Sequence, residues 1–263
     1  MKNLYFIAAL LFLTVSNISC QSWKQFNMYS IDDDKKLGLS VSKEIAANPA
    51  QYPILPEQGN EEVYKFIRGL KDDILNSGRV KNKNVFAWEV KIIKDDKTLN
   101  AFCTPGGYIY VYTGLIKFLD HEDQLAGVMG HEIAHADMRH STRQLTKIMP
   151  LAVVGEVLSA GSKSKQAIKD VTTSLIALSF SRDHEREADK YSVFYLCNGG
   201  HNAAGAAGFF KKIKGKGGST PIFMSTHPDP GNRVKDIEDL AKKLNCSPYD
   251  NGSTNYQRIK SLL

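Results

Sequence analysis

The stretch of sequence that decides the fold is residues 122–140, EDQLAGVMGHEIAHADMRH. Its first half is apolar at the spacing of one face of an α-helix, formed by Leu125, Ala126, Val128 and Met129. Its second half contains HEIAH, from His131 to His135. The apolar face predicts that the helix lies in the core, where histidines without partners would be costly. The sequence therefore favours a helix whose histidines bind something over an exposed helix with incidental histidines.

The spacing of the two histidines predicts a zinc site. Residues four apart on a helix project from the same face, so the imidazoles of His131 and His135 can bind one zinc ion. Glu132 stands beside the first of them. In this HExxH arrangement zinc acidifies and polarises a water molecule, and the glutamate takes its proton as general base. We therefore expect one zinc per chain, with Glu132 as a catalytic residue.

A catalytic zinc site needs a third protein ligand besides an open position. The metzincin arrangement is excluded, because it requires glycine and histidine where this chain has Met138 and Ser141. His140 is one residue short of the required place. The third ligand must therefore come from another part of the chain.

Residues 181–189, SRDHEREAD, supply carboxylates from a later helix. Glu185 and Asp189 are four residues apart and share a helix face. Glu185 can therefore bind zinc while Asp189 accepts the ring N–H of a ligating histidine. His184 is the competing ligand, but no carboxylate stands four residues after it to support it. Glu187 is expected to be a solvated charge.

The N-terminus has the features of an export signal. After a positive start, residues 4–16 are almost entirely apolar, a stretch too short to span a bilayer. Ser19, a small residue, precedes Cys20, as in the lipobox of bacterial lipoproteins. We expect residues 1–19 to be a lipoprotein signal peptide and residues 20–34 to be a polar leader behind a lipidated Cys20. A plain secretory signal with an ordinary thiol at Cys20 is the alternative.

The composition and the distribution of charge limit the classes of partner that we expect for this protein. The chain has 34 Lys and Arg residues against 28 Asp and Glu, and the cationic residues are scattered instead of forming a basic stripe. No nucleic-acid partner is therefore expected. Cys103, Cys197 and Cys246 are expected to be buried thiols or to form at most one disulfide. We expect a protein on the periplasmic side of a bacterial cell envelope, attached through lipid on Cys20 to a membrane, the outer rather than the inner.

Residues 35–263 predict one α+β domain that is mostly helical. Residues 85–93 and 101–112 are rich in β-formers and indicate the short strands of one small sheet. Apolar periodicity predicts helices at 34–47, 59–77, 122–140, 167–198, 203–214 and 232–244.

Several motifs together resemble one known family. They are HEIAH, SRDHEREAD, Asn100-Ala101-Phe102, Pro105-Gly106-Gly107 and Gly114-Leu115. Over residues 35–244 the chain is similar to the zinc metallopeptidases related to HtpX, BepA and the CAAX prenyl protease. It is nearest to a compact periplasmic lipoprotein type, without the membrane hairpin of HtpX or the repeat domain of BepA.

The resemblance implies a zincin-like fold with a small sheet whose edge strand flanks the active-site helix. It implies that His131, His135 and Glu185 are the zinc ligands, with Glu132 as base and Asp189 in support. It also implies that the strand near Tyr108 is that edge, where an extended substrate can add as a further strand.

Thr226-His227-Pro228 and the later Arg233 have a spacing that is frequent in this family. On one hypothesis His227 or Arg233 donates a hydrogen bond to the oxyanion of the reaction. On another, His227 occupies the fourth zinc position at rest and keeps the enzyme latent. A His-Pro turn next to the following helix is the structural alternative. The three remaining histidines, His121, His140 and His201, are expected to be structural or surface residues.

Two function classes remain. The first is a zinc endopeptidase that acts in protein quality control on unfolded or misassembled envelope proteins. The second is a lipoprotein chaperone or assembly factor with a structural metal site. Glu132 favours the first, because a structural site has no use for a general base.

Overall fold

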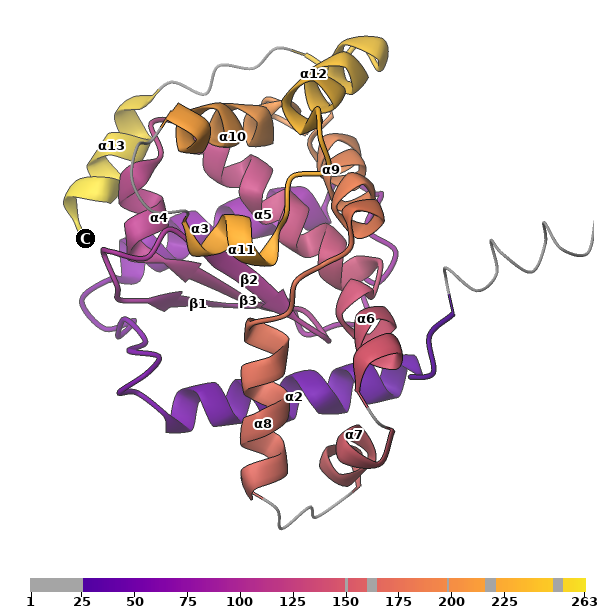
Figure 1. Cartoon of the computed structure of the whole chain (residues 1–263). Coiled ribbons are helices and arrows are strands. Elements are labelled where there is room, and N and C mark those ends of the chain that lie inside the picture. Colours follow the sequence, from indigo (N-terminus) through magenta and orange to yellow (C-terminus); the bar gives the residue numbers. More distant parts are fainter. Residues whose placement is uncertain (1–25, 150, 160–164, 198, 216–220, 248–252) are drawn as a thin grey trace, which may run out of the picture.

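The computed structural model describes residues 26–263 except 150, 160–164, 198, 216–220 and 248–252. The expected signal peptide, Cys20 and the first part of the polar leader lie outside these residues. Figure 1 shows many helices around one small sheet, so the mostly helical α+β class is confirmed. Within the described part of the chain, no helix has the length and apolar character to cross a membrane.

The helices are labelled as in Figure 1. In chain order they are α2 (Ile31–Ala47), α3 (Glu61–Leu75), α4 (Thr113–Phe118), α5 (Glu122–Asp137), α6 (His140–Ile148), α7 (Leu151–Leu158), α8 (Lys165–Ile176), α9 (Arg182–Leu196), α10 (Gly205–Gly215), α11 (Ile222–Thr226), α12 (Arg233–Lys243) and α13 (Ser253–Ser261). The helix expected from Asp34 begins at Ile31, because Ser30 and Asp33 form a capping box at its start.

The sheet has three strands in the order β1, β3, β2. β1 (Glu89–Ile93) pairs in parallel with β3 (Tyr108–Tyr112), and β2 (Ala101–Thr104) pairs antiparallel with β3 on its other side. The strand that contains Tyr108 is therefore central, and the expectation that it forms the edge is wrong. The edge strand that contacts α5 is β2. Strand spacing alone could not show this, because the pairing of β1 joins segments separated by a crossover.

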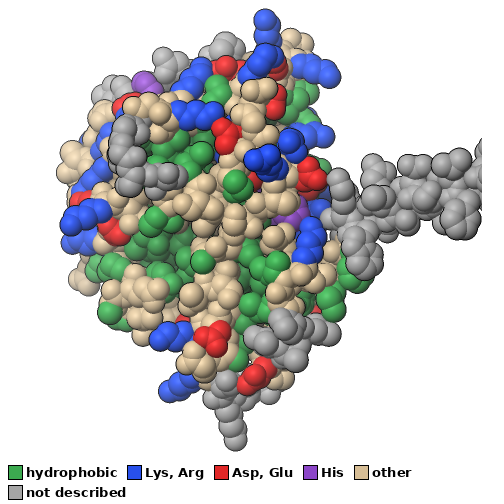
Figure 2. Space-filling model, viewed as in Figure 1, with side chains coloured by type: hydrophobic (Ala, Val, Ile, Leu, Met, Phe, Trp, Pro, Cys, Tyr) green, Lys and Arg blue, Asp and Glu red, His purple; other side chains and the backbone are tan. Residues whose placement is uncertain are grey.

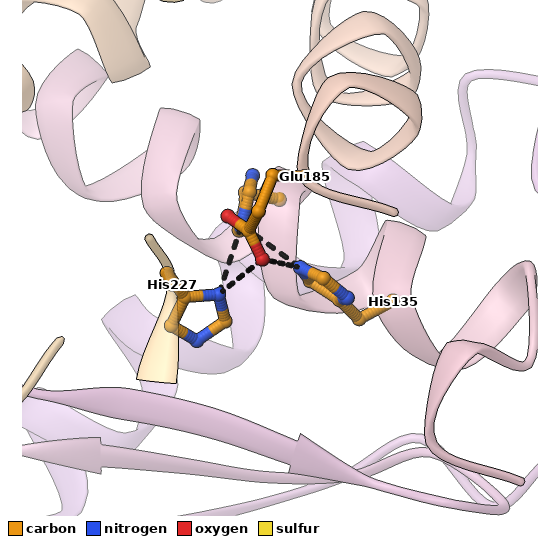
Figure 3. Close-up of side chains that lie close together, drawn as sticks. His135, Glu185 and His227 are labelled. Carbon is orange, nitrogen blue, oxygen red and sulfur yellow. Dashed lines mark hydrogen bonds and ion pairs between the residues drawn. The ribbon is translucent and has the colours of Figure 1, made fainter. Parts of the chain in front are cut away.

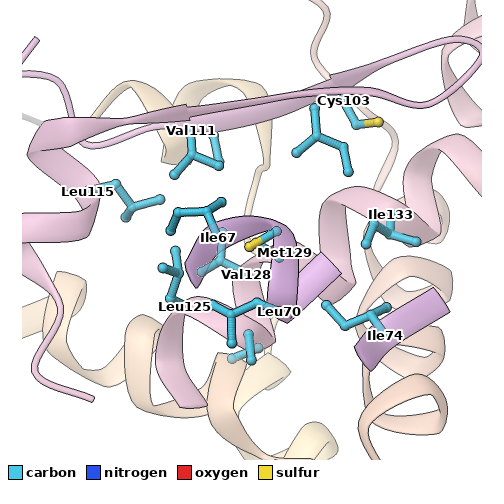
Figure 4. Packing of buried hydrophobic residues seen from close by; sticks show 14 of the residues in the cluster. Ile67, Leu70, Ile74, Cys103, Val111, Leu115, Leu125, Val128, Met129 and Ile133 are labelled. Carbon is cyan, nitrogen blue, oxygen red and sulfur yellow. The ribbon is translucent and has the colours of Figure 1, made fainter. Parts of the chain in front are cut away.

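The two faces of the sheet belong to two hydrophobic clusters. Side chains alternate between faces along a strand, so Ile109 and Val111 of β3 join α3 and α5, whereas Tyr108 and Tyr110 join α2 and α8. Figure 4 shows the first cluster, in which Val128 and Ile133 of α5 are packed below the sheet. The sheet thus holds α5 in the core, as its apolar face predicted.

Two of the expected helices are shorter than predicted. The expected helix at 167–198 is two helices, α8 and α9, because the chain leaves the helical conformation after Ile176 and restarts with Ser181 as N-cap. The Ser181 hydroxyl accepts the amide of His184 at 3.2 Å. The expected helix at 122–140 ends at Asp137, and Arg139 adopts a left-handed conformation (φ 59°) before α6 begins at His140.

Small residues let α5 lie close to two neighbouring helices. A Cβ added at Gly127 would lie 2.0 Å from the backbone nitrogen of Ala206, the second residue of α10. A Cβ added at Gly130 would lie 2.9 Å from the Ser192 hydroxyl on α9, and this hydroxyl donates to the Gly127 carbonyl at 2.9 Å. The faces of α5 and α9 that carry the sequence motifs are therefore held against each other.

A disulfide joins Cys197, at the end of α9, to Cys246, just after α12, whereas Cys103 is a buried free thiol. The expectation of at most one disulfide agrees with this pairing. On the face of the molecule shown in Figure 2, Lys and Arg side chains lie mainly around the rim next to Asp and Glu, and hydrophobic side chains gather nearer the middle.

Candidate active site

Two helices bring the motif residues together. α5 supplies His131, Glu132 and His135, and α9 supplies Glu185 and Asp189. The side chains of His131, His135 and Glu185 are at most 1% exposed. The i, i+4 spacings in both segments therefore place their side chains in one buried cluster between the two helices.

The distances within the cluster are short. His131 Nε2 and His135 Nε2 are 2.9 Å apart. The Glu185 carboxylate lies 3.4 Å from each of these nitrogens, through Oε2 for His131 and Oε1 for His135. His227, which follows α11, brings its Nδ1 within 3.2 Å of both His131 Nε2 and Glu185 Oε1. Figure 3 shows the side chains of His135, Glu185 and His227 converging on one point.

This arrangement fits a zinc ion. Tetrahedral zinc with bonds of about 2.0–2.1 Å to nitrogen separates its ligand atoms by about 3.3 Å. The four atoms from His131, His135, Glu185 and His227 all lie within 4.8 Å of one another. Two imidazole nitrogens that face each other at 2.9 Å also require a proton or a cation between them, because bare lone pairs repel. The donor set of three imidazoles and one carboxylate is typical of zinc.

The electrostatics of the cluster also favour a cation. Burial alone would raise the pKa of Glu185, but His227, His131 and His135 hold the pKa of this carboxyl well below its usual range. Burial opposes protonation of His131, yet hydrogen bonds to Asp189 and Glu185 raise its pKa to about 9. A site that attracts a proton so strongly also attracts a metal cation.

Asp189 contacts the ring nitrogen of His131 that faces away from the cluster, and Arg233 contacts Asp189. Asp189 Oδ1 lies 2.9 Å from His131 Nδ1, so His131 can present its other nitrogen to the cluster. Arg233 contacts both oxygens of Asp189, at 2.7 and 3.1 Å, and Glu185 Oε2 at 3.3 Å. Its guanidinium also lies 3.6 Å from the ring centre of Phe210. This geometry favours a positioning role for Arg233 over donation to an oxyanion.

Glu132 faces the sheet side of the cluster. It is buried, and its Oε1 has no hydrogen-bond partner although it lies 3.5 Å from His227 Nε2. The backbone amide of Cys103 in β2 hydrogen-bonds the carboxylate. Burial raises the pKa of Glu132, against the opposing effect of His227 and His131. A buried carboxylate with a free oxygen and a raised pKa is suited to accept a proton near neutral pH.

The structure also shows where His184, Glu187 and His140 lie relative to the positions expected from the sequence. His184 is not in the cluster: its ring stacks on His140, with ring centres 4.5 Å apart. Glu187 is not a freely solvated charge, because it accepts a hydrogen bond from Arg143 and pairs with His140. His140 was expected to be a structural or a surface residue, and its fully buried ring makes it a structural one. Its Nδ1 lies 3.0 Å from His135 Nδ1.

The remaining histidines lie away from the cluster. His121 is exposed at the surface, just before α5. His201 is buried, and its ring pairs with Asp73 and Asp123.

Comparison with known proteins identifies the family. The model of peptidase family M48 matches residues 64–241, which include α5, α9 and the start of α12. The chain belongs to peptidase family M48. M48 peptidases are zinc metallopeptidases, and the resemblance found from the motifs is therefore confirmed, together with the class of enzyme and its zinc cofactor.

Several proteases are similar to this chain over half of its length or more. The mitochondrial metalloendopeptidase OMA1 of Schizosaccharomyces pombe is 28% identical over 241 residues, which is 90% of this chain and 68% of the relative. The β-barrel assembly-enhancing protease of Escherichia coli is 29% identical over 58% of this chain and 34% of its own length. The metalloprotease YcaL of Escherichia coli is 29% identical over 54% of this chain and 58% of its own length. The chain thus spans between 34% and 68% of the length of these relatives.

Proposed function

We propose that this M48 peptidase is an endopeptidase that hydrolyses peptide bonds of unfolded or misassembled proteins of the bacterial cell envelope. The observation that carries the proposal is Glu132, a buried carboxylate with a free oxygen beside a cluster of three histidines and a glutamate. A base in this position is needed for hydrolysis and not for holding a metal.

His131, His135 and Glu185 are the proposed zinc ligands. When bound, zinc supplies a Lewis acid that polarises the scissile carbonyl and acidifies water. Glu132 accepts the proton of the attacking water at its free Oε1 and delivers a proton to the leaving amine. Asp189 Oδ1 lies against His131 Nδ1 and favours a proton on that nitrogen, so that the other ring nitrogen is the one offered to zinc.

His227 is proposed as a resting fourth ligand. Its Nδ1 faces the cluster at 3.2 Å, and its Nε2 faces Glu132. A neutral imidazole in this place blocks both the open metal position and the approach of water to the base. His227 must therefore move before substrate can bind, and the enzyme is latent until it does.

The substrate class and the location rest on the relatives. Two Escherichia coli relatives are bacterial proteases, and the name of one refers to β-barrel assembly. This likeness supports the proposal of an envelope substrate and a periplasmic location. A lipid anchor at Cys20, in the outer membrane, remains part of the proposal on the strength of the sequence pattern alone.

A chaperone or assembly factor with a structural metal is the second candidate. The observation that favours it is burial, because every residue of the cluster is at most 1% exposed in this conformation. A site closed in this way holds a metal equally well without catalysis.

The Glu132→Gln variant separates the two candidates. Purified protein and the His227→Ala variant are incubated with casein, with and without a chelator, and zinc content is measured in parallel. We expect Glu132→Gln to keep zinc and fold but to lose proteolysis by about a thousandfold or more, because the amide cannot accept a proton. Glu238→Gln, which changes an exposed carboxylate of α12, is the control. Proteolysis retained in Glu132→Gln, or absent from both wild type and His227→Ala, would overturn the endopeptidase proposal.

A further inference from the structure

A second series of polar contacts leads outward from the cluster, from His135 instead of His131. It begins at His135 Nδ1, which lies 3.0 Å from His140 Nδ1. His140 Nε2 lies 2.9 Å from Glu187 Oε2, and Arg143 donates to the same oxygen at 3.1 Å. The series joins α5, α6 and α9, and none of its outer members belongs to the metal cluster.

The chemistry of these groups fixes every proton in the series. Glu187 Oε2 accepts a hydrogen bond from Arg143 Nη1, and a carboxylate oxygen of such a pair acts as an acceptor toward its other neighbour as well. His140 Nε2 must therefore be the donor to Glu187. A neutral ring then has a lone pair at Nδ1, so that His135 Nδ1–H is the donor between the two rings. His135 is left with a lone pair at Nε2, the nitrogen that faces the cluster.

Packing holds His140 in the orientation that the series needs. Its ring is fully buried and stacks on His184 with ring centres 4.5 Å apart and an angle of 10° between the planes. The left-handed Arg139 places His140 at the start of α6, directly beyond the end of α5.

We propose that His140 and Glu187 are positioning residues that fix the tautomer and the ring orientation of His135, and thereby set the affinity of the site for zinc. The inference rests on the proposed ligand role of His135. A doubly protonated His140 would turn His135 around, with Nδ1 as acceptor and a proton on Nε2 pointing at the metal position. That arrangement would place a cationic ring in a fully buried position, which is costly, so the contact with Glu187 leaves the ligand nitrogen of His135 free.

Zinc affinity, measured by competition with a chromophoric chelator, tests the proposal on the full chain. In His140→Phe the ring volume is kept and both hydrogen bonds are lost, so we expect the zinc dissociation constant to rise about 10–100-fold. In His140→Asn the side-chain carbonyl can take the place of Nδ1 as acceptor, so most of the affinity should return. His184→Phe is the matched control, because it keeps an aromatic ring stacked on His140 and leaves the hydrogen bonds of His140 to His135 and Glu187 in place. This variant should bind zinc as wild type does.

A positioning role also predicts that the substitution changes the affinity for zinc and not the activity of the zinc-loaded enzyme. At saturating zinc, kcat/KM of His140→Phe should approach the wild-type value, because no reacting group has been removed. Should His140→Phe fail to fold, Glu187→Ala, which removes a partly exposed side chain, is expected to weaken zinc binding about tenfold.

The outcomes distinguish this proposal from the proposed function. Wild-type affinity in His140→Phe and Glu187→Ala would overturn the positioning role while zinc binding and proteolysis remain. Equal weakness of His140→Asn and His140→Phe would also overturn it, since packing alone would then explain the loss. If the wild-type chain itself bound no zinc, the ligand set would be wrong and the proposed function would fail first.

Discussion

His131 and His135 stand one turn apart on α5, yet the regions behind them differ. Behind His131, Asp189 and Arg233 form a closed ion pair in which the arginine is fully buried. Behind His135, a neutral ring comes first, and the carboxylate that follows it, Glu187, is 31% exposed. The two histidines have equivalent places in the sequence motif but are held in different ways. His131 is in direct contact with a carboxylate, whereas the imidazole of His140 lies between His135 and its carboxylate.

The difference shows in the protonation of the two rings. Asp189 and Glu185 raise the pKa of His131 to about 9 in spite of burial, whereas burial lowers the pKa of His135 well below its usual range. A charge in direct contact compensates for burial, and a charge one ring away does so much less. We therefore expect the site to depend more strongly on the His131 side than on the His135 side.

The largest effect is expected from Glu185→Ala, which removes the one anion that both histidines share. Zinc content should fall below about a tenth of the wild-type value, and proteolysis should fall to the level of chelator-treated protein, because the imidazoles that remain in the cluster are neutral and no anion is left to balance the charge of zinc. Metal analysis of the purified variant measures this, with His184→Phe as the control. Undiminished zinc in Glu185→Ala would transfer the ligand role to His184 or Glu187.

A matched pair of substitutions tests the inequality of the two sides. Asp189→Asn and Glu187→Gln each replace a carboxylate by an amide that can still accept a hydrogen bond. We expect the zinc dissociation constant to rise about 10–100-fold in Asp189→Asn and less than about threefold in Glu187→Gln. Asp189→Asn should also destabilise the fold by about 3–5 kcal/mol, because the buried Arg233 loses its partner.

Chelator competition and thermal unfolding of both variants provide the measurements. Equal losses of zinc affinity in the two variants would show that the two sides contribute alike, and a larger loss in Glu187→Gln would reverse the comparison.

The smallest effect is expected at His227, the third ring of the cluster. Its second nitrogen faces Glu132 instead of an outer carboxylate, so it lacks the kind of support that holds His131. We expect His227→Ala to raise basal casein hydrolysis a few-fold while zinc content stays near one per chain. A fall of a few hundredfold would instead assign His227 to the oxyanion. Activity within about twofold of wild type would reject both roles and leave a structural turn.

The sequence predicted the parts of the site that depend on local spacing. His131 and His135, like Glu185 and Asp189, are four residues apart within one helix, and the geometry of a helix turn then dictates which side chains share a face. The assignment of His131, His135 and Glu185 as ligands stays a prediction, although the structure brings the three together.

The parts that were missed depend on contacts between elements. His140 meets His135 only because Arg139 bends the chain into a left-handed conformation between α5 and α6. Glu187 meets His140 from α9, and no periodicity within either helix indicates this contact. The central position of β3 likewise results from pairing with β1, a choice of partner that the strand itself does not encode.

The close contact between α5 and α10 at Gly127 has a consequence for the interpretation of genetic variants of this protein. A methyl group at this position would collide with the backbone of α10 at 2.0 Å, and backbone cannot move aside as a flexible side chain can. Gly127→Ala should therefore abolish function as completely as a change at His131, four residues away, although glycine offers no group for chemistry. In a survey of inactivating mutations, the positions at which no substitution is accepted would thus include glycines at close helix contacts as well as residues that take part in the reaction. Only a measurement of the amount of folded protein would distinguish the two kinds of position.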